Sequence, residues 1–207
     1  FVTLSQSMKD VLTQTHGVMG GPVAVIPGCI DSARFHPPAD RSALRNRLGL
    51  RQEQKVILTV RNLVARMNLD SLIQAMPAVI QACPGAVLCI AGAGPLSSQL
   101  AALVRRSRLD EFVRFLGRLD EELLPQWYGA ADLFVMPSVS EPFGLTPFEA
   151  IGYGTPSLIS KQSGVSEVLA NCLKVDFWDV DEMANQMAAV LRYDSLRDEL
   201  HANSWRE

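Results

Sequence analysis

Short apolar runs alternate along this chain with stretches in which apolar residues have helix-like spacing. The runs are three to five residues long, as buried strands often are. They are Val23–Ile26, Val56–Val60, Val87–Ala91, Val113–Leu116, Leu133–Met136, Ser157–Ser160 and Leu173–Val175. Between several of them, apolar residues recur every three or four positions, which is typical of a helix with one buried face. This alternation predicts an α/β fold, a parallel sheet with helices on both faces.

The helical patterns carry two further expectations. Pro77 lies inside a predicted helix that spans about residues 69–80, where its ring and its missing N–H predict a kink or a looser final turn. After Asp176 the pattern is purely helical, and the apolar stripe from Met183 to Leu191 is typical of core packing rather than of a cofactor site.

One main domain is expected at residues 22–193, preceded by a strand and helix at 1–21 and followed by a trailing helix at 194–207. No repeat, low-complexity tract or linker interrupts it. The chain begins at Phe1, and its first strand runs straight into a helix. We therefore expect a fragment of a longer protein.

Composition places the chain among globular proteins. Of its 207 residues, 48% are hydrophobic, and a chain of this length holds a core without disulfides or metals. Its four cysteines form no C-x-x-C pair and three lie in or beside apolar runs, which favours reduced, buried thiols in a cytoplasmic protein. No apolar run approaches the roughly 18 residues of a membrane-spanning helix, so a soluble protein is expected.

The net charge of −3 gives no general attraction to nucleic acid, and no nucleic-acid-binding motif is present. The charge is divided unevenly, however. Residues 1–118 hold 14 Lys and Arg against 7 Asp and Glu, whereas residues 119–207 hold 5 against 15. This division suggests an anion-binding face beside an acidic one, although solvated helix faces that differ in sign explain it equally well.

Open parallel sheets bind ligands at the carboxyl ends of their strands, so the loops after the apolar runs are candidates for a site. One such loop contains Gly92 and Gly94, the start of a dinucleotide-binding pattern. Ser97 stands in place of the third glycine, and Gly117 and Arg118 end the next strand where a ribose-binding carboxylate is usual. A structural turn is the preferred interpretation, and a nicotinamide-binding domain is the weaker alternative.

The loop after Met136 leads into a predicted helix start. Pro142 and Gly144 impose an irregular backbone, and a helix can begin near Leu145 because Pro147 suits its first turn. The amides at this start would point into the crevice above the sheet, where they can bind a phosphate. They belong to Gly144, Leu145 and Thr146.

Two carboxylates border the same helix start. Glu149 lies one turn into the helix, on the face of Leu145, and Glu141 lies on the loop just before it. Both can therefore face one pocket. The alternative is that Glu149 only complements the helix dipole and that Glu141 is a solvated loop residue.

Cationic side chains follow two other strands. Arg61 and Arg66 lie in the loop after Val56–Val60, and guanidinium groups match the paired oxygens of a diphosphate. Lys161 follows a later strand and precedes a second glycine-marked helix start at Gly164. Cations, amides and carboxylates at one edge suit a nucleoside diphosphate attached to a hydroxyl-rich group. Ordinary surface arginines are the alternative.

Taken together, blocks of this sequence resemble the carboxyl-terminal half of a retaining glycosyltransferase of the family-4 type (group 1). The most specific block, Glu141–Glu149, is similar to the E-x7-E signature of that family. The others, in family order, are Val25–Asp31, Arg34–Pro37, Arg61–Arg66, Ala91–Pro95, Phe115–Arg118 and Ala131–Ser138. The resemblance implies one Rossmann-like half of a two-domain GT-B fold, with residues 1–21 as the last strand and helix of a missing amino-terminal domain.

The resemblance also implies a role for each site residue. Glu141 is the catalytic residue near the transferred sugar, Glu149 binds the ribose hydroxyls, and the backbone near Gly117 and Arg118 meets the base. The other donor-binding residues are Arg61, Asn62, Arg66, Phe143, Gly144, Leu145, Thr146 and Lys161. The implied partner is a nucleoside-diphosphate sugar. Neither a metal nor a cofactor is expected, since basic side chains and amides neutralise the leaving diphosphate.

Two departures from the family pattern fall on the predicted phosphate loop. The family most often has Gly-Arg where this chain has Arg61 and Asn62, and Lys-Gly where it has Met67 and Asn68. Both usual cationic positions are uncharged here. Arg61 and Arg66 are expected to substitute from neighbouring positions.

The leading hypothesis is the donor-binding half of a retaining glycosyltransferase, which binds a nucleotide but does not turn over alone. In this fold the amino-terminal half holds the acceptor site and often a histidine, and in relatives any membrane association depends on that half. The three histidines here lie outside the site loops; they are His16, His36 and His201. Two alternatives stay open, a noncatalytic sugar-nucleotide or glucan-binding module and a fragment of an α-glucan synthase.

Overall fold

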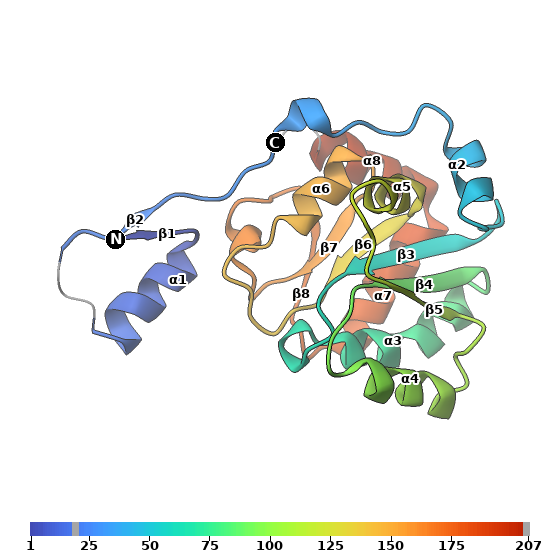
Figure 1. Ribbon diagram of the computed structural model, residues 1–207, viewed down its shortest axis with the longest axis horizontal. Coiled ribbons are helices and arrows are strands. Elements are labelled where there is room, and N and C mark those ends of the chain that lie inside the picture. The colour runs from blue at the N-terminus through green and yellow to red at the C-terminus, as the bar shows by residue number, and fades with distance from the viewer. Residues whose placement is uncertain (18–20, 205–207) are drawn as a thin grey trace.

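The computed structural model describes residues 1–17 and 21–204. Its main body is a six-stranded parallel sheet with the order β5-β4-β3-β6-β7-β8 (Figure 1). The strands are β3 Lys55–Val60, β4 Ala86–Ala91, β5 Val113–Gly117, β6 Leu133–Met136, β7 Ser157–Ser160 and β8 Leu173–Val175. Each matches a predicted apolar run to within one residue at either end. The predicted parallel sheet is therefore confirmed.

The first predicted strand does not join this sheet. Ala24–Val25 forms β2, which pairs in parallel with β1 (Val2–Thr3) in a separate two-stranded sheet. The expectation that Val23–Ile26 belongs to the main sheet is wrong. The physical reason is that β1 supplies the hydrogen-bond partners: Ala24 N–H donates to Phe1 O at 3.0 Å, and Ile26 N–H donates to the carbonyl of Thr3 at 2.8 Å.

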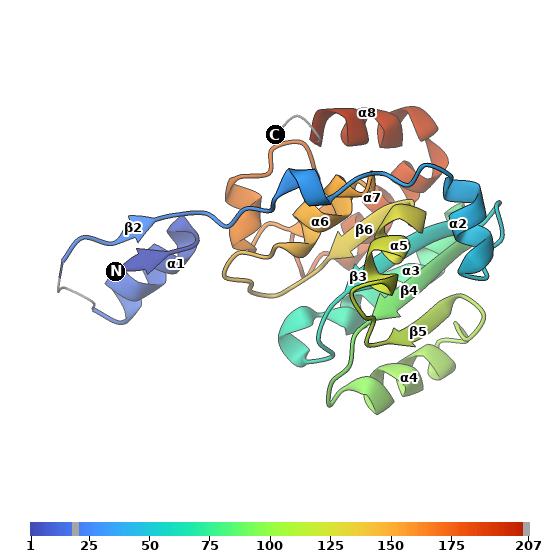
Figure 2. The same ribbon diagram turned by 45° about the horizontal axis from the view of Figure 1, so that its top comes forward.

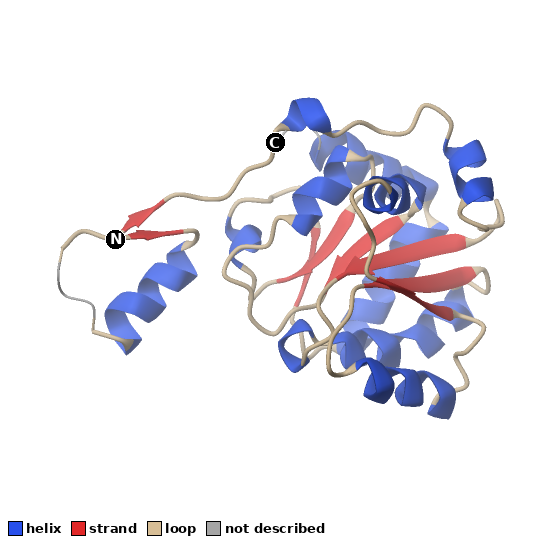
Figure 3. Cartoon of the chain, in the orientation of Figure 1, coloured by secondary structure: helices blue, strands red, loops and turns tan. Residues whose placement is uncertain are grey.

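Helices cover both faces of the main sheet (Figure 3). Those of one face are α3 Leu69–Ala82, α4 Ser97–Arg106 and α7 Val180–Arg192, and those of the other are α2 Arg41–Arg47, α5 Leu123–Ala130 and α6 Thr146–Gly152. Successive residues of β3 enter opposite cores: Ile57 joins the first, whereas Val56 and Leu58 join the second. Strands buried on both faces explain why the runs are almost wholly apolar.

The last two helices complete the first core. Met183 and Leu191 of α7 are buried there, as core packing of the stripe requires. The predicted trailing helix is present as α8 (Asp194–Ser204), whose Leu196 and Leu200 pack on the same core. The remaining positions of the two predicted end segments, 18–20 and 205–207, lie outside the described residues. α3 is continuous through Pro77 and ends at Ala82.

The leading segment, residues 1–17, contacts the main body beside the loop that follows β6. It contains α1 (Gln6–Asp10), which continues as the π-helical turn Val11–Thr15 (Figure 2). The first two amides of α1 donate to the carboxylate of Glu167 at 2.6 and 2.9 Å. Ser5 Oγ donates to the carbonyl of Pro142 at 2.8 Å. The leading segment is thus attached to the loops at the carboxyl edge of the sheet.

A buried ion cluster anchors α2 at the amino-terminal ends of the strands, opposite the loops that the leading segment contacts. Asp132, just before β6, has a side chain only 3% exposed, and its carboxylate accepts hydrogen bonds from Arg41 at 2.8 Å and from Arg45 at 3.3 Å. The amide of Val56 donates to the same carboxylate at 2.6 Å. Charge pairing and backbone hydrogen bonding together compensate the burial of Asp132.

Candidate functional site

The strand order reverses between β3 and β6, which makes this pair the switch point of the sheet. From β3 the chain continues to α3 on one face, and from β6 it continues to α6 on the other. The two loops therefore diverge, and ligands of open α/β sheets bind in the crevice at such a point. The loops are residues 61–68 and 137–145, which include most of the site residues predicted from the sequence.

Arg61, the first residue after β3, is buried and links the two loops. Only 6% of its side chain is exposed. Its Nη2 donates to Ser138 Oγ at 2.6 Å and to the carboxylate of Glu141, and its Nη1 lies 3.4 Å from Thr146 Oγ1. Burial lowers the pKa of Arg61, and the opposite charge of Glu141 counteracts that shift. One cation thus holds both sides of the crevice together.

Glu141 meets a second cation. Arg66 Nη1 lies 3.4 Å from Glu141 Oε2 and donates to the carbonyl of Ser140 at 2.7 Å. The side chain of Arg66 is 47% exposed, so this guanidinium, unlike that of Arg61, reaches solvent. The structure therefore brings three of the predicted residues together, with both guanidiniums on the carboxylate.

The backbone of the Glu141 loop is fixed by the segment after β7. Glu141 and Ser163 form an isolated parallel bridge, and the amide of Gly164 donates to the carbonyl of Glu141 at 2.9 Å. A Cβ at position 164 would lie 2.2 Å from the carbonyl oxygen of Pro142, so a glycine is needed there. The loop thus has a defined place without regular structure.

α6 begins where the sequence predicts, at Thr146, with Pro147 in its first turn. Gly144 has a φ of 96°, in the left-handed region that favours glycine. Among the described residues, the amides of 144–146 have no hydrogen-bond acceptor. These three N–H groups are therefore available to an anionic ligand.

Glu149, one turn into α6, is held by a tyrosine that the sequence did not reveal. The hydroxyl of Tyr128 in α5 donates to Glu149 Oε2 at 2.8 Å. Tyr128 is 1% exposed; its burial, and then the negative charge of Glu149, raise the pKa of this phenol. Its ring stacks on that of Tyr153, with centroids 6.0 Å apart. No motif marks Tyr128, because its role depends on how α5 packs on α6.

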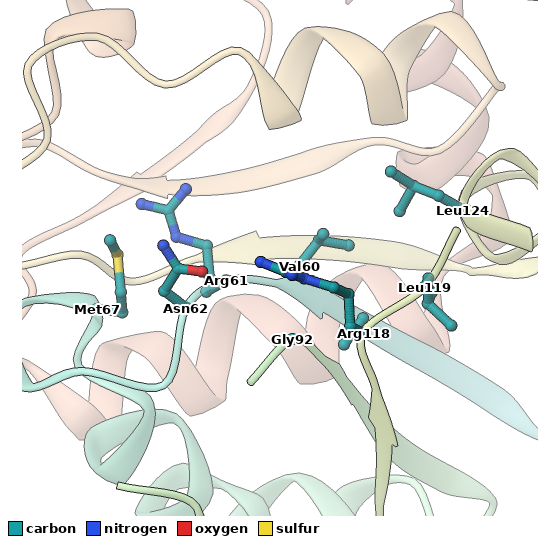
Figure 4. A pocket seen from close by; sticks show the side chains of 9 residues that line it. Val60, Arg61, Asn62, Met67, Gly92, Arg118, Leu119 and Leu124 are labelled. Atoms are coloured by element: carbon teal, nitrogen blue, oxygen red, sulfur yellow. The ribbon is translucent and has the colours of Figure 1, made fainter. Parts of the chain in front are cut away.

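A pocket of about 270 Å³ opens at the ends of β3, β4 and β5 (Figure 4). Asn62 and Arg118, both exposed, line it together with Arg61 and Met67. Gly117, just before Arg118, has a φ of 70° and accepts a 2.7 Å hydrogen bond from the amide of residue 92. The pocket therefore lies between Arg118, which is predicted to be near the base, and the loop after β3.

The glycines between β4 and α4 allow close backbone contact with the β3 loop. A Cβ at Gly92 would lie 1.8 Å from Arg61 O, and one at Gly94 would lie 2.5 Å from the carbonyl oxygen of Leu63. These contacts give both glycines a structural role, as the preferred interpretation of this G-x-G expects.

The second departure from the family pattern, at positions 67 and 68, has a structural role. Met67 is 6% exposed, and Ser138 Oγ lies 3.7 Å from its sulfur. Asn68 adopts the left-handed conformation with a φ of 56°, which asparagine tolerates better than most residues. Its side-chain amide donates to the carbonyls of Pro137 at 3.1 Å and Phe177 at 2.7 Å. Asn68 therefore ties the start of α3 to two loops at this edge.

The side chains of Lys161 and Phe143, two other predicted donor-binding residues, contact protein groups in this structure. Lys161 pairs with Asp176 at 2.8 Å, and this hydrogen bond raises the pKa of the lysine. The side chain of Phe143 is buried and stacks on Phe148 with centroids 5.9 Å apart. Any contact of Phe143 with a ligand in the crevice would therefore come from its backbone.

Within residues 1–17 and 21–204 there is no cluster of three or more His, Cys, Asp or Glu side chains that could hold a metal ion. Cys83 and Cys89 are buried, Cys172 is half-buried and Cys29 is exposed, so the expectation of buried thiols fails for Cys29. None of the helices in this part of the chain is both long and apolar enough to span a membrane.

Curated relatives match most of this chain. A GDP-mannose-dependent monoacylated alpha-(1-6)-phosphatidylinositol monomannoside mannosyltransferase of Corynebacterium glutamicum is 36% identical over 177 residues, covering 80% of this chain and 46% of the relative. Mannosylfructose-phosphate synthase of Agrobacterium fabrum is 31% identical and covers 90% and 44%. Glycogen synthase of Mycobacterium tuberculosis is 35% identical and covers 82% and 39%. The chain thus spans less than half the length of these relatives.

Solved structures share the fold. Sucrose-phosphate synthase of Thermosynechococcus elongatus superposes with a TM-score of 0.87 at 27% identity, covering 99% of this chain and 52% of that protein. Anabaena HepE in complex with UDP also gives 0.87, at 24% identity, with 99% and 57% covered. The C-terminal domain of a Francisella tularensis group 1 glycosyl transferase gives 0.78 at 20% identity, and 95% of that domain is covered.

These matches agree with the resemblance read from the sequence. The expected fold, one Rossmann-like half of a GT-B glycosyltransferase, is confirmed. The family model described as glycosyl transferases group 1 matches residues 40–206, which include both loops of the crevice and α6. This chain belongs to the group 1 glycosyl transferases.

Proposed function

We propose that this chain is the donor-binding half of a retaining glycosyltransferase, which moves a sugar from a nucleoside diphosphate to an acceptor. The observation that carries the proposal is the composition of the switch-point crevice. It combines the carboxylate of Glu141, the solvent-reaching guanidinium of Arg66 and the amides of 144–146, which have no acceptor within residues 1–17 and 21–204. A neutral sugar linked to an anionic diphosphate needs this combination of acceptors and cations.

Each part of the donor has a suitable partner in the crevice. Arg66 and the amides at the start of α6 stabilise the negative charge that grows on the diphosphate as it leaves. Glu141 faces the transferred sugar, and Glu149, oriented by Tyr128, accepts hydrogen bonds from the ribose. The pocket between Asn62 and Arg118 receives the base. Lys161 borders the diphosphate from the loop after β7. This chemistry uses no metal or cofactor.

The acceptor is bound by a second, amino-terminal domain of the same protein. The curated relatives are more than twice as long as their match to this chain, which leaves room for such a domain. Our proposal therefore includes nucleotide binding by this chain alone and sugar transfer only with its partner domain. We place the whole protein in the cytoplasm, where the thiols of Cys83, Cys89 and Cys172 stay reduced.

A thermal-shift panel tests donor binding directly. The chain is heated with UDP, GDP, ADP and their sugars, and with a reduced nicotinamide dinucleotide as the competing ligand class. A ligand at about a hundred times its Kd should raise the Tm by about 5–10 °C. Arg106→Met on the exposed surface of α4 is the matched control and should show the same shifts. A panel in which only the nicotinamide dinucleotide stabilises the chain contradicts the proposal.

A noncatalytic sugar-nucleotide or glucan-binding module is the second candidate, because positions 62 and 67 lack the usual cations and Arg61 is paired with Glu141. The full-length protein separates the candidates. If it transfers sugar, Glu141→Gln should abolish transfer while nucleotide binding persists, and Glu149→Gln, at the ribose, should weaken nucleotide binding. A parent that binds nucleotide sugar but never transfers it supports the module. The glycogen synthase match favours an α-glucan as one product to assay first.

A further inference from the structure

Arg61 lacks the exposure that a phosphate-binding arginine requires. Its terminal nitrogens face protein atoms of the loop after β6 and of α6, namely Ser138 Oγ, the Glu141 carboxylate and Thr146 Oγ1. Its side chain is 6% exposed, against 47% for Arg66. Nη2 is engaged by Ser138 and Glu141, and a side chain that is 6% exposed offers little surface to a diphosphate.

Burial explains why this pair forms. The side chain of Glu141 is 15% exposed, so both partners have lost most of their hydration. A charge removed from water is tolerated when an opposite charge and hydrogen bonds replace the solvent, and losing one partner leaves the other uncompensated. Ser138 shares Nη2 with the carboxylate and restricts the orientation of the guanidinium.

The pair also joins the two sides of the switch point. Arg61 follows β3, and Glu141 follows β6, 80 positions later in the sequence. The position of the Glu141 carboxylate in the crevice is therefore set by a residue that follows the neighbouring strand, β3. Arg66, on the same loop as Arg61, approaches the carboxylate from solvent.

We propose that Arg61 is a positioning residue that holds the Glu141 carboxylate in the crevice and does not itself bind the diphosphate. The proposal rests on the proposed function, which places a donor sugar at Glu141. It leaves the diphosphate to Arg66 and to the amides at the start of α6. It also replaces the expectation that Arg61 and Arg66 both substitute for the missing cations at positions 62 and 67.

A double-mutant cycle of Arg61→Met and Glu141→Gln separates the two roles. Calorimetry measures the Kd of the nucleoside diphosphate that gives the largest thermal shift, and of its sugar, for the parent, both single variants and the double variant. We expect Arg61→Met alone to weaken diphosphate binding more than tenfold, because it removes the buried partner of Glu141 and leaves only the half-exposed Arg66 to offset that negative charge beside the ligand. In the Glu141→Gln background the same substitution should change the Kd less than threefold. A tenfold loss that persists in that background overturns the proposal.

The same four proteins give a readout that needs no ligand. In urea, the effects of the two substitutions on the unfolding equilibrium constant should depart from additivity by more than tenfold, as expected for a buried pair. Additive effects overturn the positioning role. Coupled effects in a parent that binds no nucleotide support the pairing and overturn the proposed function instead. Arg106→Met is the control, and Arg61→Gln, which removes the charge but keeps a hydrogen-bonding side chain, replaces Arg61→Met in both measurements if the latter does not fold.

Discussion

The hydroxyl of Tyr128 donates a 2.8 Å hydrogen bond to Glu149 Oε2, which joins α5 to α6 beneath the crevice. Tyr128→Phe keeps the ring and removes this donor. A lost hydrogen bond to a charged group should lower the free energy of unfolding by about 1.5–3 kcal/mol. Urea unfolding measures the loss. Tyr153→Phe, on the ring stacked against Tyr128, is the control and should cost less. Equal losses for the two variants would show that the bond to Glu149 adds nothing.

The close approach of Gly164 to Pro142 predicts a steric effect on the Glu141 loop. In Gly164→Ala the new methyl group would meet the carbonyl of Pro142 at 2.2 Å, so the loop must move. We expect weaker nucleotide-sugar binding by calorimetry as well as lower stability. Gly49→Ala is the control, because position 49 has open space around it and a φ of 66°. That variant should lose about 1 kcal/mol of stability and no affinity. Unchanged affinity in Gly164→Ala would show that the loop does not set the site.

The buried carboxylate of Asp132 should matter for stability alone. Asp132→Ala leaves the buried Arg45 without its ion-pair partner, which should cost about 3–5 kcal/mol. Asp132 lies at the amino-terminal end of β6, whereas the crevice lies at the carboxyl ends of the strands. The nucleotide Kd should therefore be unchanged for the protein that remains folded. Asp198→Ala, which removes an exposed partner of Arg197, is the control and should have little effect. A loss of affinity in Asp132→Ala would show that the ion cluster and the crevice do not act independently.

Glu167 should control the attachment of the leading segment. Glu167→Gln removes the charge that accepts hydrogen bonds from the first two amides of α1. We expect faster hydrogen exchange at residues 6–10, measured by mass spectrometry, and unchanged exchange in β3 and β4. Glu199→Gln on α8 is the matched control. Protection of α1 equal to that of the parent would show that the segment is held by other contacts.

The pair of Lys161 and Asp176 makes a prediction about pH. Hydrogen bonds from Lys161 and then from Gln162 lower the pKa of Asp176. Because the folded-state pKa lies below the unfolded value of about 3.9, the stabilisation is present above that pH and is lost as the pH falls through the folded pKa. In Lys161→Met, the Asp176 titration followed by NMR should move back toward the ordinary value. A titration that does not move would show that Lys161 does not pair with Asp176 in solution.

Local pattern was sufficient for most of the fold. The six strands of the main sheet were readable because a strand buried on both faces must be apolar throughout, whatever its neighbours are. The start of α6 at Thr146 was readable because Pro147 and Gly144 restrict the backbone locally. The pairing of β2 could not be predicted, because an apolar run indicates a strand but not which other strand it pairs with.

The strands, the helix start and the charged and glycine-marked loops at the carboxyl ends of the strands could be predicted, because they depend on residues that are neighbours in the sequence. Which charges pair with one another depends on the folded arrangement. Arg61 and Glu141 are 80 positions apart, and Tyr128 and Glu149 are 21 apart on different helices. Whether such groups pair with each other or face a ligand depends on how the layers stack and how deeply each group is buried. That choice made Arg61 the partner of a carboxylate and left Arg66 reaching solvent.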